Sequence, residues 1–89
     1  MRAVITVIGK DMVGILAGVS NICAGHGVNI TEVTQSVMQD LFAMIMLVDL
    51  TGSKVPFAAL SGELEEFGQQ SGLSVRIMHE DIFNSMHRI

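Results

Sequence analysis

A short polar turn near the start of the chain has the residue types to hold a small ligand. Gly9–Ile15 reads Gly-Lys-Asp-Met-Val-Gly-Ile, and it lies between a β-branched run and a helical pattern. The N-terminus of a helix offers unpaired N–H groups and a partial positive charge, which suit a carboxylate. Gly14 would let a ligand approach the backbone closely. We therefore expect a small-molecule site at this turn.

A second polar group, the amide of Asn29, is expected at the start of the next strand. An amide offers one acceptor and two donors, which suit the ammonium and carboxylate groups of an amino acid. The predicted binding residues are Asp11, Met12, Val13, Gly14, Ile15, Leu16, Asn29 and Ile30. Each polar position also has a purely structural interpretation. Asp11 could cap the helix, Gly14 could serve only the turn, and Asn29 could stabilise the turn after Gly27.

The other reactive residues form no catalytic constellation. The turn lacks the Lys-Ser or Lys-Thr ending of a phosphate-binding loop. Cys23, the single cysteine, falls on the predicted buried face of a helix and is interpreted as a core residue. His26, His79 and His87 lack the i, i+3 or i+4 spacing expected of two metal ligands on one helix. We expect no enzyme, no metal site and no cofactor.

Length, composition and charge restrict the class of protein. The 89 residues predict one domain over 1–89, with a core over about 3–79 and a C-terminal helix over about 81–88. The formal charge of −4 argues against nucleic acid as a partner. The longest apolar run, Leu41–Val48, is too short to span a membrane, and no signal-peptide pattern is present. With a single cysteine, these features predict a cytoplasmic protein.

Hydrophobic periodicity predicts the element order β-α-β-β-α-β followed by a short helix. The strands are expected over 2–8, 28–38, 41–48 and 73–79, and the helices over 15–26, between Ser53 as N-cap and Gly72, and over 81–88. Two split βαβ units with right-handed crossovers give a ferredoxin-like sandwich. This α+β fold is a four-stranded antiparallel sheet with both long helices on one face.

Some local features of these elements can also be predicted. Asp11 occupies the expected N-cap of the first helix, which should bury one face: Ile15, Leu16, Val19, Ile22, Cys23 and His26. Along strand 28–38 the apolar residues switch from one set of alternate positions to the other, so we expect a bulge near Thr31–Glu32. We also expect the strand to lie at an edge of the sheet. Strand 41–48 is apolar on both parities, which predicts a central strand that is buried on both faces.

The predicted layout leaves one face of the sheet without a helical layer. The two long helices cover only one face, although strand 41–48 carries apolar residues for both. An uncovered apolar patch of several hundred square ångströms is unusual for a soluble monomer. The second face must therefore be covered by the terminal helix, by another subunit or by both. We expect a homo-oligomer, most simply a dimer through sheet edges or faces.

A ferredoxin-like fold does not decide function, so alternatives are tested by their residues. An RNA-recognition module stacks bases on strand aromatics, but strand 2–8 has none and strand 41–48 has only Phe42. The turn lacks the two cysteines of a copper chaperone and the arginine of an acylphosphatase-like enzyme.

The turn, the next strand and the tail carry a family resemblance. Gly9–Ala17, followed by Gly27–Ile30, resembles the start of an ACT domain. The whole chain, including Ile82–Ile89, resembles the small stand-alone ACT proteins of the UPF0237 family and is similar to the ACT halves of glycine-cleavage-system regulators. The resemblance implies a regulatory module that binds an amino acid or a similar metabolite at a subunit interface.

The resemblance also indicates which turn residues match the family pattern. Asp11, Gly14 and Asn29 match, whereas Met12 and Val13 stand where many ACT turns carry a basic residue and a proline. That departure keeps open a protein-interaction or oligomerisation module without a ligand. A small enzyme is the least favoured alternative.

Overall fold

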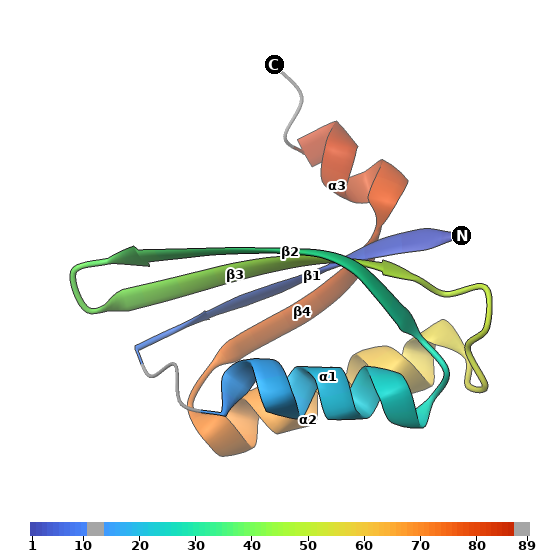
Figure 1. The fold of residues 1–89 in the computed structure, drawn as a ribbon, viewed down its shortest axis with the longest axis horizontal. Helices are drawn as coiled ribbons and strands as arrows, with labels where there is room; N and C mark the ends of the chain where they lie inside the picture. The colour runs from blue at the N-terminus through green and yellow to red at the C-terminus, as the bar shows by residue number, and fades with distance from the viewer. Residues whose placement is uncertain (11–13, 87–89) are drawn as a thin grey trace.

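The fold is a single antiparallel sheet with two long helices on one face. The computed structural model describes residues 1–10 and 14–86. Its elements are β1 (Arg2–Gly9), α1 (Ile15–Gly25), β2 (Asn29–Met38), β3 (Leu41–Asp49), α2 (Phe57–Ser71), β4 (Ser74–His79) and α3 (Glu80–Met86). The strand order is β2-β3-β1-β4, and α1 and α2 lie together on one side of the sheet (Figure 1). The predicted ferredoxin-like architecture is confirmed.

The register of the sheet places β3 and β1 at its centre and β2 and β4 at its edges. β1 pairs antiparallel with β3 and with β4, while β2 pairs only with β3. The β2–β3 register shifts between Ile30 and Glu32, so the predicted bulge is confirmed. Gln39, in the two-residue hairpin that joins β2 to β3, adopts φ 55°.

The core fills the space between the sheet and the helices. Alternate residues of the strands point toward α1 and α2, where aliphatic and methionine side chains dominate: Ala3, Ile5, Val7, Phe42, Met44, Met46, Val48, Val75 and Ile77. The helices contribute the buried side chains of Ile15, Val19, Cys23, Leu60 and Leu64. Each large aliphatic side chain buried here contributes about 1.5–3 kcal/mol.

Two loops interlock at the end of α1 where β2 begins. Gly27 adopts φ 73°, and a Cβ there would lie 2.5 Å from the carbonyl oxygen of Gly52. The N–H of Lys54 donates a hydrogen bond to the carbonyl of His26 at 2.8 Å. Only a glycine tolerates both the left-handed backbone and this close approach, so the loop before α2 fixes where β2 starts.

Three local predictions are wrong. β3 buries only the side chains that point toward the helices. On its other face, Leu41 and Ile45 remain 38% and 43% exposed. Leu16 is 41% exposed, since the buried stripe of α1 is narrower than the run of apolar residues. The N-cap of α1 is Gly14 rather than Asp11, a residue that lies outside the described ranges.

The predicted cap of α2 is also wrong, for a local reason. Its N-cap is Pro56, whereas the hydroxyl of Ser53 donates to the carbonyl of Val55 at 2.8 Å and accepts from its N–H. Ser53 therefore stabilises the turn before the helix instead of the helix itself. Gly72 closes α2 with φ 71°, as predicted.

α2 offers a matched pair of glycines for testing the packing. A Cβ at Gly62 would meet nothing within 4 Å, whereas one at Gly68 would lie 2.9 Å from the Leu73 carbonyl and from Cγ2 of Val75. We expect Gly62→Ala to raise the free energy of unfolding by about 0.5–1 kcal/mol and Gly68→Ala to lower it by about 1–3 kcal/mol. Urea unfolding at one protein concentration measures both. Shifts of the same sign would contradict the packing of α2 against β4.

Candidate functional site

The predicted binding turn leads from the end of β1 into α1. Asp11, Met12 and Val13 lie outside the described residues. Gly14 has φ 74°, and nothing lies within 4 Å of a Cβ built on it, so its surroundings are open. Its carbonyl accepts the first helical hydrogen bond, from the N–H of Gly18 at 2.9 Å. The backbone N–H groups that follow Gly14 at the start of α1 have no partner within a helix, which is the feature that suits an anion.

The apolar residues at this helix start have different environments. Ile15 is buried in the core at 2% exposed, whereas Leu16 points outward. Ile15 therefore fixes the first turn of α1 against the sheet. Leu16 leaves an exposed apolar side chain beside the N-terminus of the helix.

The predicted polar partner, Asn29, opens β2 at the other end of α1. It is exposed and faces Asp49 across the β2–β3 ladder. Among residues 1–10 and 14–86, no hydrogen bond involves the Asn29 side chain, so its amide does not stabilise the turn after Gly27. Ile30 is half-buried and packs against the core. This arrangement leaves the amide of Asn29 available to a group outside the described chain.

The structure does not bring the two halves of the predicted site together within one chain. α1 has 11 residues, which corresponds to a length of about 16 Å. Gly14 precedes this helix and Asn29 follows it, so the two positions lie at opposite ends of α1, the helix whose course Figure 1 shows. The helix predicted over 15–26 lies between the two positions, so the sequence already implies this separation.

Three charged residues near Asn29 were not predicted. The stem of Lys54 passes close to Gly27, and Nε2 of His26 lies 2.5 Å from Oε2 of Glu63. The carboxylate of Asp49 accepts hydrogen bonds from the hydroxyl and the N–H of Thr51, at 2.6 and 2.9 Å. These bonds hold the pKa of Asp49 below its usual value, so the group stays ionised.

Only the spatial pairing of loops could have revealed this cluster. Lys54 and Glu63 are far from Asn29 in sequence, and Asp49 is adjacent only through the β2–β3 register. The sequence did offer one signal, since the glycines at 27 and 52 mark two turns that can approach closely.

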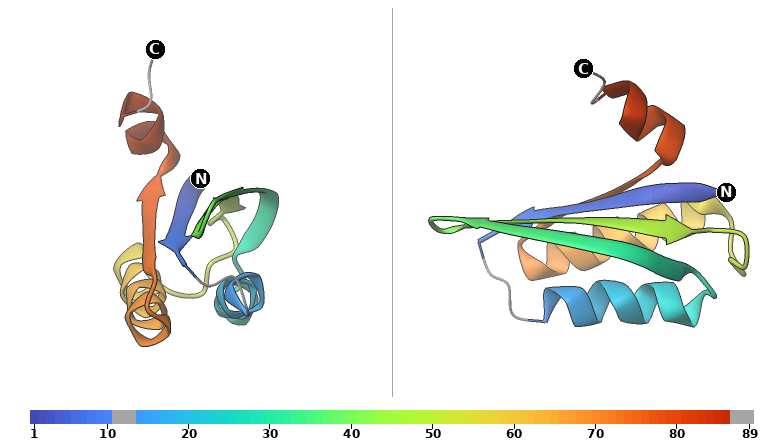
Figure 2. Two further views of the ribbon diagram at one scale, coloured as in Figure 1. Left: turned by 90° about the vertical axis from the view of Figure 1, so that its left-hand side faces the viewer. Right: turned by 45° about the horizontal axis from the view of Figure 1, so that its top comes forward.

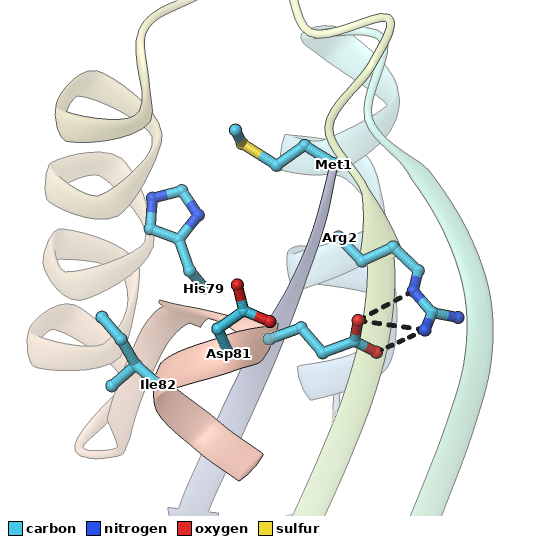
Figure 3. A pocket seen from close by; sticks show the side chains of 6 residues that line it. Met1, Arg2, His79, Asp81 and Ile82 are labelled. Carbon is cyan, nitrogen blue, oxygen red and sulfur yellow. Dashed lines mark hydrogen bonds and ion pairs between the residues drawn. The ribbon is translucent and has the colours of Figure 1, made fainter. Parts of the chain in front are cut away.

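A second concavity lies at the root of α3 and was also missed. This crevice of about 600 Å³ is lined by Met1, Arg2, His79, Glu80, Asp81 and Ile82 (Figure 3). Arg2 donates from Nε and Nη2 to Oε1 of Glu80 at 3.1 and 3.0 Å. The ring of His79 stacks on Phe57 with centroids 4.3 Å apart. These contacts attach the first turn of α3 to β1 and place His79 against the start of α2.

The chemistry available elsewhere is limited. Cys23 is buried, and burial raises the pKa of its thiol to about 11. In the described part of the chain, no three His, Cys, Asp or Glu side chains are grouped to hold a metal ion. No helix formed by those residues has the length and apolarity required to cross a membrane.

Comparisons with known proteins agree with this architecture. The family model of the ACT domain matches residues 2–78. A UPF0237 protein of Clostridium acetobutylicum is 53% identical over 89 residues, covering 100% of both chains. An ACT domain protein from Streptococcus pneumoniae superposes with a TM-score of 0.80 at 41% identity, covering 93% of each chain. A protein described as a glycine cleavage system transcriptional repressor superposes with a TM-score of 0.71 at 26% identity, covering 86% of this chain and 44% of that one.

The sheet order, the glycine turn and the match over most of the chain together define an ACT regulatory domain. Full-length similarity to small stand-alone proteins then narrows the assignment. The chain belongs to the UPF0237 family of ACT-domain proteins.

The burial of Cys23 gives a direct test of its structural role. A thiol with a raised pKa remains protonated at pH 8, and the protonated form is a poor nucleophile. We expect the folded protein to react slowly with a thiol reagent at that pH, and the urea-unfolded chain to react rapidly and completely. Rapid labelling of the folded protein would show a reactive thiol and would contradict its role as a core residue.

Proposed function

We propose that this ACT domain senses a small amino-acid-like ligand at an interface between two copies of the chain. The observation that carries the proposal is the separation of the turn and Asn29 at opposite ends of α1. A ligand a few ångströms long cannot contact both ends of one helix. It can contact both if a second copy supplies the other half.

The free edge of β2 is the surface that supports such a pairing. All of β2 is exposed except Ile30, and its outer edge pairs with no described strand. The strand has no lysine, arginine or proline, which are residues that commonly protect an edge from pairing. An edge of this kind favours β-pairing with another chain.

A two-fold axis beside β2 would unite the two halves of the site. Antiparallel pairing of β2 with its symmetry mate also sets the two α1 helices antiparallel. The Gly14 end of one helix then approaches the Asn29 end of the other. Two equivalent sites would result, each with residues from both copies, and ACT domains commonly oligomerise and bind small ligands.

The residues proposed for each site match the groups of a zwitterion. The N–H groups after Gly14 and the helix dipole would bind the ligand carboxylate, and Leu16 would contact its apolar part. The Asn29 amide of the other copy would bind the ammonium group, with Asp49 as a nearby negative charge. Asp11, Met12, Val13, Ile15 and Ile30 complete the proposed lining.

The proposed output is a change in association rather than catalysis. A ligand that contacts both copies binds only the pair, so it stabilises that pair relative to the separate chains. The same linkage would let the domain favour or release a partner protein. The apolar positions Met12 and Val13 support an alternative, an interaction module that uses the same interface without a ligand.

A thermal-shift screen with the twenty amino acids separates these two functions. A ligand at a hundred times its dissociation constant stabilises the folded state by about 2.7 kcal/mol. We expect at least one amino acid to raise the melting temperature, and Asn29→Ala to abolish that shift. Gln69→Ala removes an exposed amide from α2 and serves as the control. Absence of any shift, with related metabolites included, would favour the module without a ligand.

The β2 edge can be tested independently of any ligand. Val33, in the middle of β2, is 40% exposed. Val33→Lys would place like charges close together across a paired two-fold edge, so we expect it to break that interface. Light scattering coupled to size exclusion should show a smaller assembly, while the β-branched control Val33→Thr keeps the larger one. An unchanged mass for Val33→Lys would contradict pairing through β2.

A further inference from the structure

The face of the sheet opposite α1 and α2, here called the open face, is only half covered. Near the Arg2 end, Val4 is 4% exposed, and α3 contacts both β1 and β4 there. Toward the Gly9 end, large apolar side chains on the same face are uncovered: Ile8 48%, Met38 57%, Leu41 38% and Ile45 43% exposed. We call these four residues the bare half of the open face.

The pairing register of the strands shows which polar side chains lie beside the bare half on the open face. Cα partners in neighbouring strands share a face, so Thr34, Ile45, Thr6 and Arg76 lie in one row across the sheet. Ser36, Ala43, Ile8 and Ser74 form the next row. Arg76 is the single charged residue in these two rows, which makes this half of the face apolar with one positive charge at its β4 edge.

Helix α3 stands away from the sheet on the same side as the open face. Figures 1 and 2 show it rising from the end of β4 instead of lying along the strands. None of its residues is buried, and Ile82 and Met86 are 52% and 65% exposed. Its first turn is nevertheless attached to β1, because Nη2 of Arg2 lies 2.7 Å from Oε2 of Glu80. The direction of the helix is therefore set, while the side chains of Ile82 and Met86 lack a covering layer.

The total surface of the chain is larger than that of a compact monomer of its size. A compact monomer of 9.6 kDa is expected to expose roughly 5,100 Å². The chain exposes 5594 Å². The excess is roughly 500 Å², more than half of the ≈ 800 Å² that each partner buries in a standard interface.

We propose that α3 of one copy docks on the bare half of the open face of a second copy, and that the contact is reciprocal. α3 covers its own sheet at the Arg2 end and leaves the Gly9 end bare. A two-fold axis that runs above the open face, parallel to the sheet and perpendicular to the strands, turns the two open faces toward each other and exchanges these ends. α3 of each copy then lies over the bare half of the other copy. A second copy therefore covers both α3 and the bare half at once.

Charge complementarity supports this occupant over an unrelated apolar partner. Asp81 in the first turn of α3 is exposed, and it has no ion-pair partner within the part of the chain that the structure describes. Arg76, beside the bare half, is exposed and lacks such a partner within the same ranges. The proposed axis brings the β4 edges together, so Asp81 of each copy approaches Arg76 of the other. A second copy supplies the apolar residues and the opposite charge in one surface.

This interface is separate from the β2 edge and does not depend on a ligand. With both interfaces present, the protein assembles as a dimer of dimers. In the Val33→Lys chain, which lacks the β2 interface, only the open-face dimer remains. That chain is the background in which the new contact is tested.

The test is a charge exchange read by light scattering coupled to size exclusion. In the Val33→Lys background, we expect Arg76→Asp to convert the dimer to a monomer, and adding Asp81→Arg to restore the dimer. Ile82→Glu should also give a monomer, whereas Ala58→Glu, an exposed control on α2, should leave the dimer intact. Circular dichroism and the urea midpoint establish that each variant is folded. If Arg76 and Asp81 did not meet across an interface between copies, exchanging their charges would not produce this loss and recovery of mass.

Each contrary outcome has a definite meaning. A monomeric Val33→Lys chain, or a dimer that persists in both Arg76→Asp and Ile82→Glu, overturns the open-face contact. Failure of Asp81→Arg to restore the Arg76→Asp variant overturns the proposed orientation and hence the docking of α3. If Val33→Lys has no effect but Arg76→Asp halves the mass, the open-face contact stands and the β2 interface of the proposed function fails.

Discussion

Helix α1 acts as a rigid spacer between the two ends of the sheet, and the proposed function depends on that spacing. Its buried face, anchored by Ile15, Val19 and Cys23, fixes it along the sheet. The N-terminal turn therefore cannot approach the start of β2 within the same chain. Any ligand that uses both must be bound between chains, which couples binding to assembly in a single physical step.

A second constraint comes from placing both long helices on one face of the sheet. β3 carries apolar residues on both faces, but only the parity of Phe42, Met44, Met46 and Val48 meets a helix in the single chain. The remaining apolar side chains belong to α3 and to the β3 residues that point away from α1 and α2. The fold therefore leaves apolar surface that an assembly can bury. This surface lies at two separate places, the β2 edge and the open face.

Under the proposed function, these two constraints would give the domain a simple means of regulation. A ligand at the β2 interface would change the stability of one contact without touching the other. Lys54, Asp49 and the His26–Glu63 pair lie at the Asn29 end of α1, where the proposed β2 interface would form. They concentrate charge where the interlocked turns at Gly27 and Gly52 hold the backbone in place.

Much of the fold could be predicted from the sequence, because its signals are local. The β-branched run before Gly9, the helical periodicity of α1 and the parity change near Thr31 all follow from side-chain sterics and burial. The N-caps of α1 and α2 were missed because a glycine or proline can occupy the N-cap without a capping side chain, as Gly14 and Pro56 do.

The site was less predictable, because its geometry depends on where distant segments lie. The helix predicted over 15–26 already separates the turn from Asn29, but the proximity of Lys54 to Gly27 requires the packing of two loops. The sequence also could not tell what covers the β3 side chains that point away from the helices. An apolar strand has the same sequence pattern whether its second face meets a helix or a second chain.

The most direct test of a shared site is complementation between two defective chains. Leu16→Glu places a negative charge beside the carboxylate site of the turn, and Asn29→Ala removes the amide at the other end. Each variant alone should fail to bind the amino acid that stabilises the wild-type protein. After the two are mixed and allowed to exchange subunits, calorimetry should detect binding again, because each mixed dimer contains one site with neither change. A mixture that binds no better than its components would contradict a site built from two copies.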